Sequence, residues 1–256
     1  MQIRTYYPGT RLQPFVNAYT IVETLQESTY KVLPDTGLVL GFQFKGRLSH
    51  FAGEKELLLD STGVSGLSDQ YNVFKNTAGT GTLLVYFKEA GAAHFFRQPL
   101  HELFRESVSL DHFMLRSELL LLEEQLHEAQ TDPAKIQVIE RFLIARLNTV
   151  EPDQLVIAAL EHIHRSKGNI RIAELARLLH SSQSPLEKKF RQAVGASPKK
   201  FSSIVRMKHA IQNYQPGGSL TELGYEAGFY DQAHFISAFK LFTGETPELF
   251  LRKGSE

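Results

Sequence analysis

The sequence predicts an α+β protein of two domains, with a small β-rich domain first and an all-α domain last. As far as residue 87, short runs of apolar, β-branched and aromatic residues alternate with Gly, Pro and Asp, which is typical of a small barrel or sandwich. From Leu115 onward the apolar residues recur at helical spacing. Near the end, FRQAVGASPKKF (190–201) and FKLFTGETPELF (239–250) agree in residue type at six positions without a gap, so the helical part contains a repeat.

Composition places the chain among ordinary globular proteins. Its 256 residues are 42% hydrophobic and 22% charged, which suits one or two domains with buried cores. The chain contains no Cys, so disulfides, Cys-bound zinc and thiol catalysis are excluded. No stretch reaches the ~18 apolar residues of a membrane span, and the first residues lack the apolar segment of a signal peptide. We therefore expect a cytoplasmic protein with no membrane partner.

Residues 1–108 are expected to form the β-rich domain. Its strands are predicted from apolar runs that lie between turn residues, at 30–34, 37–44, 71–74 and 81–87. After the last of these runs the pattern changes. Residues 90–104 are typical of short helical pieces, which Pro99 interrupts.

Residues 109–152 are expected to form a helical connector. A first helix is predicted over residues 115–129, where leucines recur on one side. A second helix is predicted to begin at Asp132-Pro133, with Asp132 as the N-cap and Pro133 at the first helical position. Both helices are richer in leucine than a linker requires. They therefore either pack on the first domain or pair two protomers.

A second domain is expected over residues 153–256, after the turn residues Glu151-Pro152-Asp153. It holds 14 Lys and Arg against 10 Asp and Glu, and because the whole chain holds 28 of each, residues 1–152 hold 14 against 18. An acidic first part and a basic last part indicate two domains with different partners.

The repeated stretch ends one larger unit and begins the next helix in both copies. Each unit, at 172–195 and 220–244, consists of a short helix, a tight turn and a second helix, which is the outline of a helix-turn-helix. Gly195 and Gly244 are placed to end the second helices, and a hydroxyl residue followed by Pro begins the next ones. One long helix, predicted over residues 198–214, joins the two units.

This arrangement resembles the DNA-binding domain of AraC-type transcription regulators. The second unit matches the most diagnostic stretch of that family, a GF, an acidic residue, F-x3-FK and G-x-[ST]-P, in GFYDQAHFISAFKLFTGETPELF (228–250). The first unit matches L-x3-FK-x3-G-x-[ST]-P over residues 186–198, with Arg191 at the place of the Lys. Arg206 stands where the family carries an arginine on the joining helix. The resemblance covers roughly residues 155–253.

The first domain resembles, through less specific motifs, the cupin-like small β-barrel in front of some AraC-type regulators. The similarity lies in VLPDTGLVLGFQF (32–44) and LLVYFKEAGAAHFFRQPLHEL (83–103). Where that pattern commonly has a Pro-Gly-Gly-like turn, this chain reads KEAGAAHFF (88–96). The resemblance implies a sensor or dimerisation domain in front of a sequence-specific DNA-binding domain. The barrel either binds a small-molecule effector or serves only dimerisation or protein contact.

The side chains expected to read bases lie near the start of the second helix of each unit, because that end of a recognition helix faces the base edges in the major groove. The resemblance implies three of them in the first unit, and the exposed pattern indicates three in the second: Ser184, Glu187 and Lys188, then Gln232, Ala233 and Ser237. Lys contacts guanine O6 and N7, Glu accepts from cytosine N4, Gln reads adenine, and Ala packs on the thymine methyl group.

A second set of basic residues is expected to contact phosphates, which positions a protein on DNA without reading its sequence. These residues are Arg191, Lys199, Lys200, Arg206, His234 and Lys240. Backbone N–H groups at the helix N-termini near Ser184 and Asp231 are expected to add to them. Apolar residues four apart on each second helix predict its buried face instead: Leu186 and Phe190, then Phe235 and Phe239.

An enzyme is the alternative that a cupin-like barrel raises, because such barrels also hold metals through clustered His and a carboxylate. The barrel region holds only His50, His94 and His101, with no H-x-H pair. His162 and His164 do form such a pair, but in a helical run, where residues two apart do not face each other. The chain also lacks a phosphate-binding Gly-rich loop and a G-x-S-x-G elbow.

We therefore expect no enzymatic activity, no cofactor and no metal. The expected partners are double-stranded DNA, a small-molecule effector if the barrel holds one, and a second copy of the chain in a homodimer. RNA polymerase joins them if the protein is an activator.

Overall fold

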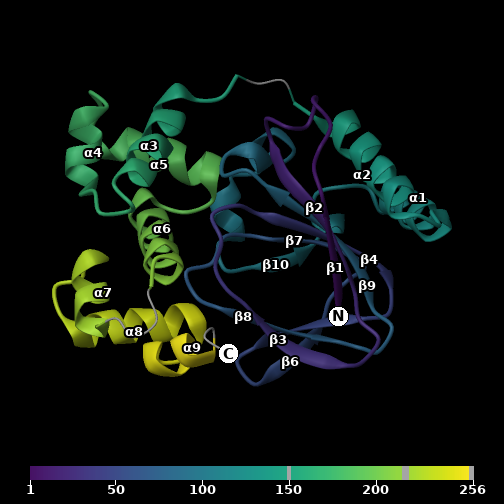
Figure 1. Ribbon diagram of the computed structural model, residues 1–256. Coiled ribbons are helices and arrows are strands. Elements are labelled where there is room, and N and C mark those ends of the chain that lie inside the picture. The colour runs from purple at the N-terminus through teal and green to yellow at the C-terminus, as the bar shows by residue number, and fades with distance from the viewer. Residues whose placement is uncertain (149–150, 215–218, 254–256) are drawn as a thin grey trace.

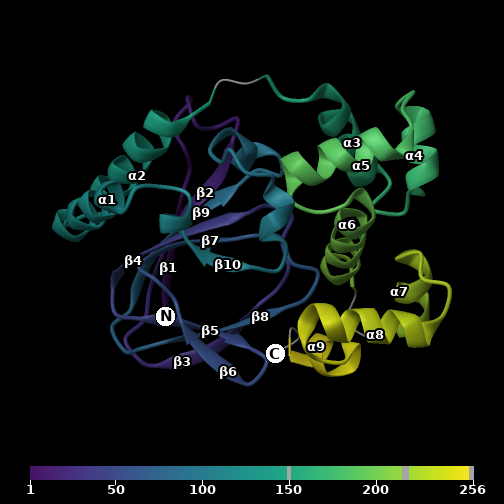
Figure 2. The same ribbon diagram turned by 180° about the vertical axis from the view of Figure 1, so that it is seen from behind.

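A computed structural model describes residues 1–148, 151–214 and 219–253 (Figure 1). The first part of the chain forms two β-sheets and the rest is helical, as the sequence predicts. The connector helices α1 (Arg116–Glu128) and α2 (Asp132–Arg146) lie on one side of the sheets. The helices from α3 (Gln154–Arg165) onward lie on the other side, as Figure 2 also shows.

The β-strands form two separate antiparallel sheets. The larger sheet contains β1 (Gln2–Tyr6), β2 (Val16–Glu23), β9 (Gly81–Phe87), β4 (Val39–Lys45), β7 (Thr62–Ser65) and β10 (Ser107–Ser109), in that spatial order. The smaller sheet contains β3 (Ser28–Val32), β8 (Asn72–Asn76), β5 (Leu48–Ala52) and β6 (Lys55–Leu58), also in spatial order. No strand pairing joins the two sheets within the described residues, so the expected cupin-like barrel is open rather than closed.

The core of the first domain includes the layer between the larger sheet and the connector. Residues along β4 alternate between buried and half-buried, so Phe42 and Phe44 point to one face. Helix α2 covers that face, and the rings of Phe42 and Phe142 meet edge to face with centroids 6.0 Å apart. The buried leucines of α1 are Leu119, Leu122 and Leu126. Packing of the connector on the first domain is thus confirmed, and pairing of two protomers stays a prediction.

Helix α2 begins differently from the prediction. Thr131 is its N-cap, and the Thr131 hydroxyl accepts the N–H of Ala134. The carboxylate of Asp132 turns to the first strand, where Arg4 Nε donates to it at 2.5 Å and the Tyr6 hydroxyl at 2.8 Å. The prediction of Asp132 as N-cap was wrong because a charge-assisted hydrogen bond is roughly twice as strong as a neutral one, and Arg4 offers one.

The rest of the chain is built from short helices. Three 3-10 turns lie between β9 and α1, namely η1 (Gly91–His94), η2 (Leu100–Leu103) and η3 (Leu110–His112). They confirm the short helical pieces predicted around Pro99. The α-helices after α3 are α4 (Ile172–Leu178), α5 (Gln183–Val194), α6 (Pro198–Gln212), α7 (Leu220–Glu226), α8 (Gln232–Thr243) and α9 (Pro247–Lys253). None of the helices in the described residues is long and apolar enough to cross a membrane.

The repeated stretch builds the same small structure twice. Gly195 and Gly244 end α5 and α8 in the left-handed conformation, with φ of 94° and 77°, which glycine adopts without steric cost. In both copies the first and last Phe of the stretch meet with ring centroids 5.5 Å apart: Phe190 with Phe201 and Phe239 with Phe250. The repeat therefore fastens each second helix to the helix that follows it.

Candidate nucleic-acid interface

The two predicted helix-turn-helix units are present, and α6 joins them. Helix α4 packs on α5 in the first unit, and α7 packs on α8 in the second. Figures 1 and 2 show the two units at opposite ends of α6. Helix α6 contacts α5 at one end and α7 toward the other, so it is the direct link between the two units.

All six side chains predicted to contact bases are exposed, and they lie in the first half of α5 and of α8. They are Ser184, Glu187, Lys188, Gln232, Ala233 and Ser237. The predicted buried faces are confirmed, because Leu186, Phe190, Phe235 and Phe239 each have an exposed fraction of 0%. Each recognition helix is therefore anchored by apolar residues on one side and presents polar or small residues on the other.

The N-termini of the two recognition helices differ. Asp231 is the N-cap of α8, and its carboxylate accepts the N–H of His234 at 2.7 Å. The N-cap of α5 is Ser182, whose side chain makes no capping hydrogen bond. A carboxylate at a helix N-terminus already occupies the place that a phosphate would take. This terminus therefore fits the predicted backbone contact with phosphate less well than the start of α5 does.

Five of the six residues predicted to contact phosphates are exposed: Arg191, Lys199, Lys200, His234 and Lys240. Arg206 differs from them because it is half-buried, with its guanidinium over the ring of Phe229 at 4.5 Å. Its Nε atom is buried without a hydrogen-bond partner within the described residues, and burial lowers the pKa of the guanidinium below its ordinary value. These surroundings suit a packing role between α6 and the second unit better than a phosphate contact.

Lys200 is exposed but already has a partner in the first domain. Its ammonium group lies 3.1 Å from the carboxylate of Asp69 and 4.4 Å from the ring centroid of Phe104. Arg105 donates to the same carboxylate at 2.5 Å. Burial acts to raise the pKa of Asp69, but the hydrogen bonds from Arg105 and Lys200 outweigh it and bring this pKa below its ordinary value. A predicted phosphate contact is thus held by an acidic residue of the β-rich domain.

Other contacts also join the β-rich domain to the helices after the connector. Helix α5 packs against both η1 and η2. His164 and Glu89 form an ion pair at 2.7 Å, Lys31 and Glu245 form one at 3.1 Å, and Lys208 pairs with Asp35. The first helix-turn-helix unit therefore rests on the β-rich domain through the packing of α5, and the ion pairs hold α3, α6 and the end of the second unit to the same domain.

Tyr230 is absent from the predicted contacts, although the structure exposes it beside a recognition helix. It lies in the turn between α7 and α8, directly before the N-cap of α8, with an exposed fraction of 92%. The sequence did contain a signal for this residue, because a helix-turn-helix turn requires only small or polar residues and an aromatic residue stands there instead.

Two family models match parts of the chain. A family described as a helix-turn-helix domain matches residues 175–253. A family described as a domain of unknown function, DUF6597, matches residues 4–109. The first match spans most of both units and the helix that joins them, and the second spans the two sheets.

The curated relatives are regulators. The chain is 34% identical to the Msm operon regulatory protein of Streptococcus mutans over 95 residues, which is 36% of this chain and 34% of that protein. It is 24% identical to an uncharacterized HTH-type transcriptional regulator of Staphylococcus aureus over 251 residues, which is 90% of this chain and 33% of that protein. The chain thus spans about a third of the length of these relatives.

Two solved structures are similar to the chain at low identity. ToxT from Vibrio cholerae shares 11% identity over 98% of both chains, with a TM-score of 0.46. A transcriptional regulator from Chromobacterium violaceum, described by its AraC-type DNA-binding domain, shares 22% identity over 40% of this chain and 93% of that chain, with a TM-score of 0.37.

The helix-turn-helix match covers the same residues in which the AraC-type motif appears twice, and the structure folds both copies as helix-turn-helix units. On this evidence residues 175–253 belong to a helix-turn-helix domain family, and a β-rich domain lies in front of the two helix-turn-helix units.

Proposed function

We propose that the protein is a transcription regulator that binds double-stranded DNA at a defined sequence through α5 and α8. The observation that carries this proposal is the pair of recognition helices, each buried on one face and exposed at its first half, in two units that α6 joins through its contacts with α5 and α7. The helix-turn-helix family match and the regulator names of the relatives support it.

The two units contribute differently to recognition of the DNA sequence. In the first, Ser184, Glu187 and Lys188 contact bases, and in the second Gln232 carries most of the sequence preference. Ala233 and Ser237 are short, so the second unit reads fewer bases. Arg191, Lys199, Lys200, His234 and Lys240 contact phosphates, and the exposed Tyr230 adds a contact to the sugar-phosphate backbone beside α8.

The proposed domains are those expected from the sequence. The sensor or dimerisation domain comprises residues 1–108, the helical connector residues 109–152, and the DNA-binding domain residues 153–256. The first boundary falls within the short strand β10 (Ser107–Ser109), and the second lies close to residues 149–150, which are outside the described residues. We place the protein in the cytoplasm, where its DNA is, as a homodimer under the control of a small-molecule effector. RNA polymerase is its further partner if it activates transcription. The alternative is a regulator without a ligand, whose β-rich domain serves only dimerisation or protein contact.

The proposal includes that the protein is not an enzyme. The relatives that support it are named as regulators.

Sequence selection from a fragmented genomic library, with the purified protein at physiological salt, tests the function. Wild type is expected to enrich one motif, and Lys188→Ala and Gln232→Ala are expected to relax different parts of it, because each loses about 1–3 kcal/mol of discrimination at its own position. Gln192→Ala, on the exposed second half of α5, is the matched control and leaves the motif unchanged. Lack of any enriched motif, or equal effects of all three variants, contradicts the proposal.

A further inference from the structure

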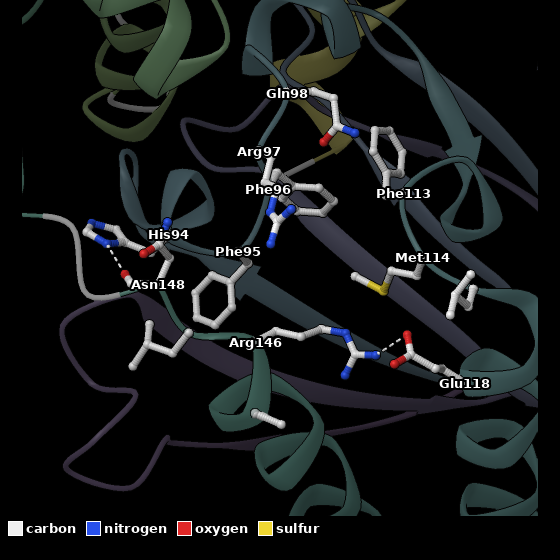
Figure 3. A pocket seen from close by; sticks show the side chains of 13 residues that line it. His94, Phe95, Phe96, Arg97, Gln98, Phe113, Met114, Glu118, Arg146 and Asn148 are labelled. Carbon is white, nitrogen blue, oxygen red and sulfur yellow. Dashed lines mark hydrogen bonds and ion pairs between the residues drawn. The ribbon is translucent and has the colours of Figure 1, made fainter.

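A cavity of about 790 Å³ lies outside the two sheets, between the segment after β9 and the connector helices. Three segments line it: residues 94–98, which begin with the last residue of η1, residues 113–118 around the start of α1, and residues 145–148 at the end of α2. Figure 3 shows their side chains converging on one space. A volume of this size falls within the range of roughly 300–1,000 Å³ that is usual for small-molecule sites.

One part of the cavity wall is apolar and largely aromatic. Phe95, Phe96, Phe113 and Met114 contribute to it. The rings of Phe96 and Phe113 meet edge to face with centroids 5.3 Å apart, which fixes their orientation. Phe95 and Phe113 are half-buried, so their free faces are available to a flat apolar body.

The charges of the cavity leave one cation unopposed. Arg146 is neutralised by Glu118 at 2.8 Å, and its guanidinium lies over the ring of Phe142 at 4.0 Å. Arg97 is exposed and has no ion pair or hydrogen bond within the described residues. Figure 3 shows its guanidinium pointing into the space that Phe95, Phe96 and Met114 frame. An unpaired guanidinium next to apolar walls favours an anionic ligand, because the pair gains strength where water is partly excluded.

The start of α1 adds to this preference for an anion. The N-cap of α1 is Leu115, which lines the cavity and has no polar atom in its side chain to accept the free backbone N–H groups. The positive end of the helix dipole therefore lies at the rim of the cavity without a capping side chain, and Glu118, the acidic residue of the first turn, is paired with Arg146.

We propose that this cavity binds a small organic anion with an aromatic body. Its acid group pairs with Arg97, and its ring packs among Phe95, Phe96 and Phe113. The site lies on the outer side of the β-rich domain, against the connector, rather than between the two sheets.

The segment that forms one wall of this cavity also supports the recognition helix of the first unit. Residues 94–98 line the cavity, while η1 and η2, on either side of them, pack on α5. The contact is close: a Cβ added at Gly195, the residue that ends α5, would lie 3.3 Å from the carbonyl oxygen of Leu100. A ligand that shifts this segment therefore acts on the helix that we propose reads DNA.

The opposite wall is tied to the same segment. Asn148 donates its backbone N–H to the carbonyl of His94 at 2.8 Å, and the His94 ring nitrogen Nδ1 lies 3.1 Å from the carbonyl of Asn148. The end of the connector and the start of the cavity segment thus move together. This control of DNA binding rests on the proposed function, whereas binding of the anion does not.

Binding is tested with 8-anilinonaphthalene-1-sulfonate, and N-phenyl-1-naphthylamine serves as the neutral control with the same aromatic body. Both probes fluoresce more strongly in apolar surroundings, so titration of the unsubstituted chain follows their binding directly. We expect a saturable signal from the sulfonate probe, and calorimetry on the same chain is expected to give the same affinity with one site per chain.

Two arginine variants locate the acid group. Arg97→Gln is expected to weaken binding of the sulfonate by about tenfold or more and to leave the neutral probe unchanged, because only the charge-assisted pair is lost. Arg141→Gln, an exposed position on α2 outside the cavity, is the matched control and changes neither affinity. Equal losses in both variants, equal affinity for both probes, or the absence of saturable binding overturns the proposal.

The coupling is tested on the DNA site selected by the wild-type protein. The factor by which the sulfonate changes the affinity for that DNA must equal the factor by which the DNA changes the affinity for the sulfonate. If the sulfonate binds at Arg97 but neither ligand changes the affinity for the other, the site is supported and its coupling to DNA binding is overturned. If no DNA sequence is selected, the proposed function fails, and the binding assay without DNA still decides the cavity.

Discussion

Some side chains of the candidate interface have two competing partners, and Lys200 is the clearest example. Its ammonium group is placed to meet a phosphate, yet it lies 3.1 Å from Asp69 of the β-rich domain. Both partners are anions, so the two contacts exclude each other. The acidic residue therefore competes with DNA for the same cation.

Replacement of Asp69 by Asn is expected to tighten binding to the selected DNA by about two- to fivefold, since an exposed ion pair contributes about 0.5–1 kcal/mol. The dependence of the affinity on salt should also steepen by about one phosphate contact. Fluorescence anisotropy over a range of salt concentrations measures both. Asp111→Asn, which removes an exposed carboxylate that forms no ion pair with Lys200 in the described residues, is the control. An unchanged salt slope in Asp69→Asn would show that Lys200 is not a phosphate contact.

The roles of some residues could be predicted from the sequence, and those of others could not. The glycines that end α5 and α8, and the Phe positions beneath them, follow from local rules of helix capping and periodicity, and the structure confirms them. Asp132 could not be predicted, because its partner Arg4 lies 128 residues away in the sequence. Arg206 differs from its predicted role for the same reason, since the ring of Phe229 that covers it belongs to the second unit.

Among the helices and turns, the turn after α3 is the one on which the joining helix α6 depends. Gly168 ends α3 with φ of 79°, and a Cβ there would lie 2.2 Å from the carbonyl oxygen of Ser202 and 2.7 Å from the backbone nitrogen of Arg206. Both contacts are with the backbone of α6, which cannot rotate away as a side chain can. The close approach fixes α3 against the helix that positions both units.

Gly168→Ala and Gly53→Ala form a matched pair of substitutions. Comparison of their losses in unfolding free energy distinguishes the cost of the clash with α6 from the cost of the left-handed backbone. Gly53 lies between β5 and β6 with φ of 64°, and nothing lies within 4 Å of an added Cβ. Each substitution is expected to cost about 1–2 kcal/mol for the left-handed conformation. Gly168→Ala is expected to cost about 1–3 kcal/mol more, because the backbone of α6 must move. Urea unfolding measures both free energies, and equal losses would show that the packing against α6 is not strained.

At the scale of the whole molecule, one ion pair makes the contact between the domains depend on pH. His164 on α3 pairs with Glu89 in the segment after β9, at 2.7 Å. The hydrogen bond that His164 Nε2 donates to the Glu89 carboxylate raises the pKa of His164 above its ordinary value of 6.5, although burial opposes this shift. The stabilisation is therefore fully present below pH 6.5 and is lost as the pH rises through the raised pKa.

Thermal melts of wild type and Glu89→Gln across this pH range check the effect. Wild type is expected to lose about 1–2 °C more than the variant as the pH rises, because the pair is partly exposed and the chain is long. His127→Gln, an exposed position on α1, should retain the wild-type pH profile. Parallel profiles for wild type and Glu89→Gln would mean that the pair contributes nothing to stability.

The fold class, the two helix-turn-helix units and the polar faces of their second helices could all be predicted from the sequence. These features depend on helical periodicity, capping and turn residues, which act within a few positions along the chain. The tertiary structure decided the rest: the open arrangement of the two sheets, the pairing of Lys200 with Asp69, the burial of Arg206, and the cavity at Arg97. Each of these depends on segments far apart in the sequence. Which of these segments come into contact depends on which apolar faces are buried together. The local spacing of residues along the chain does not indicate this.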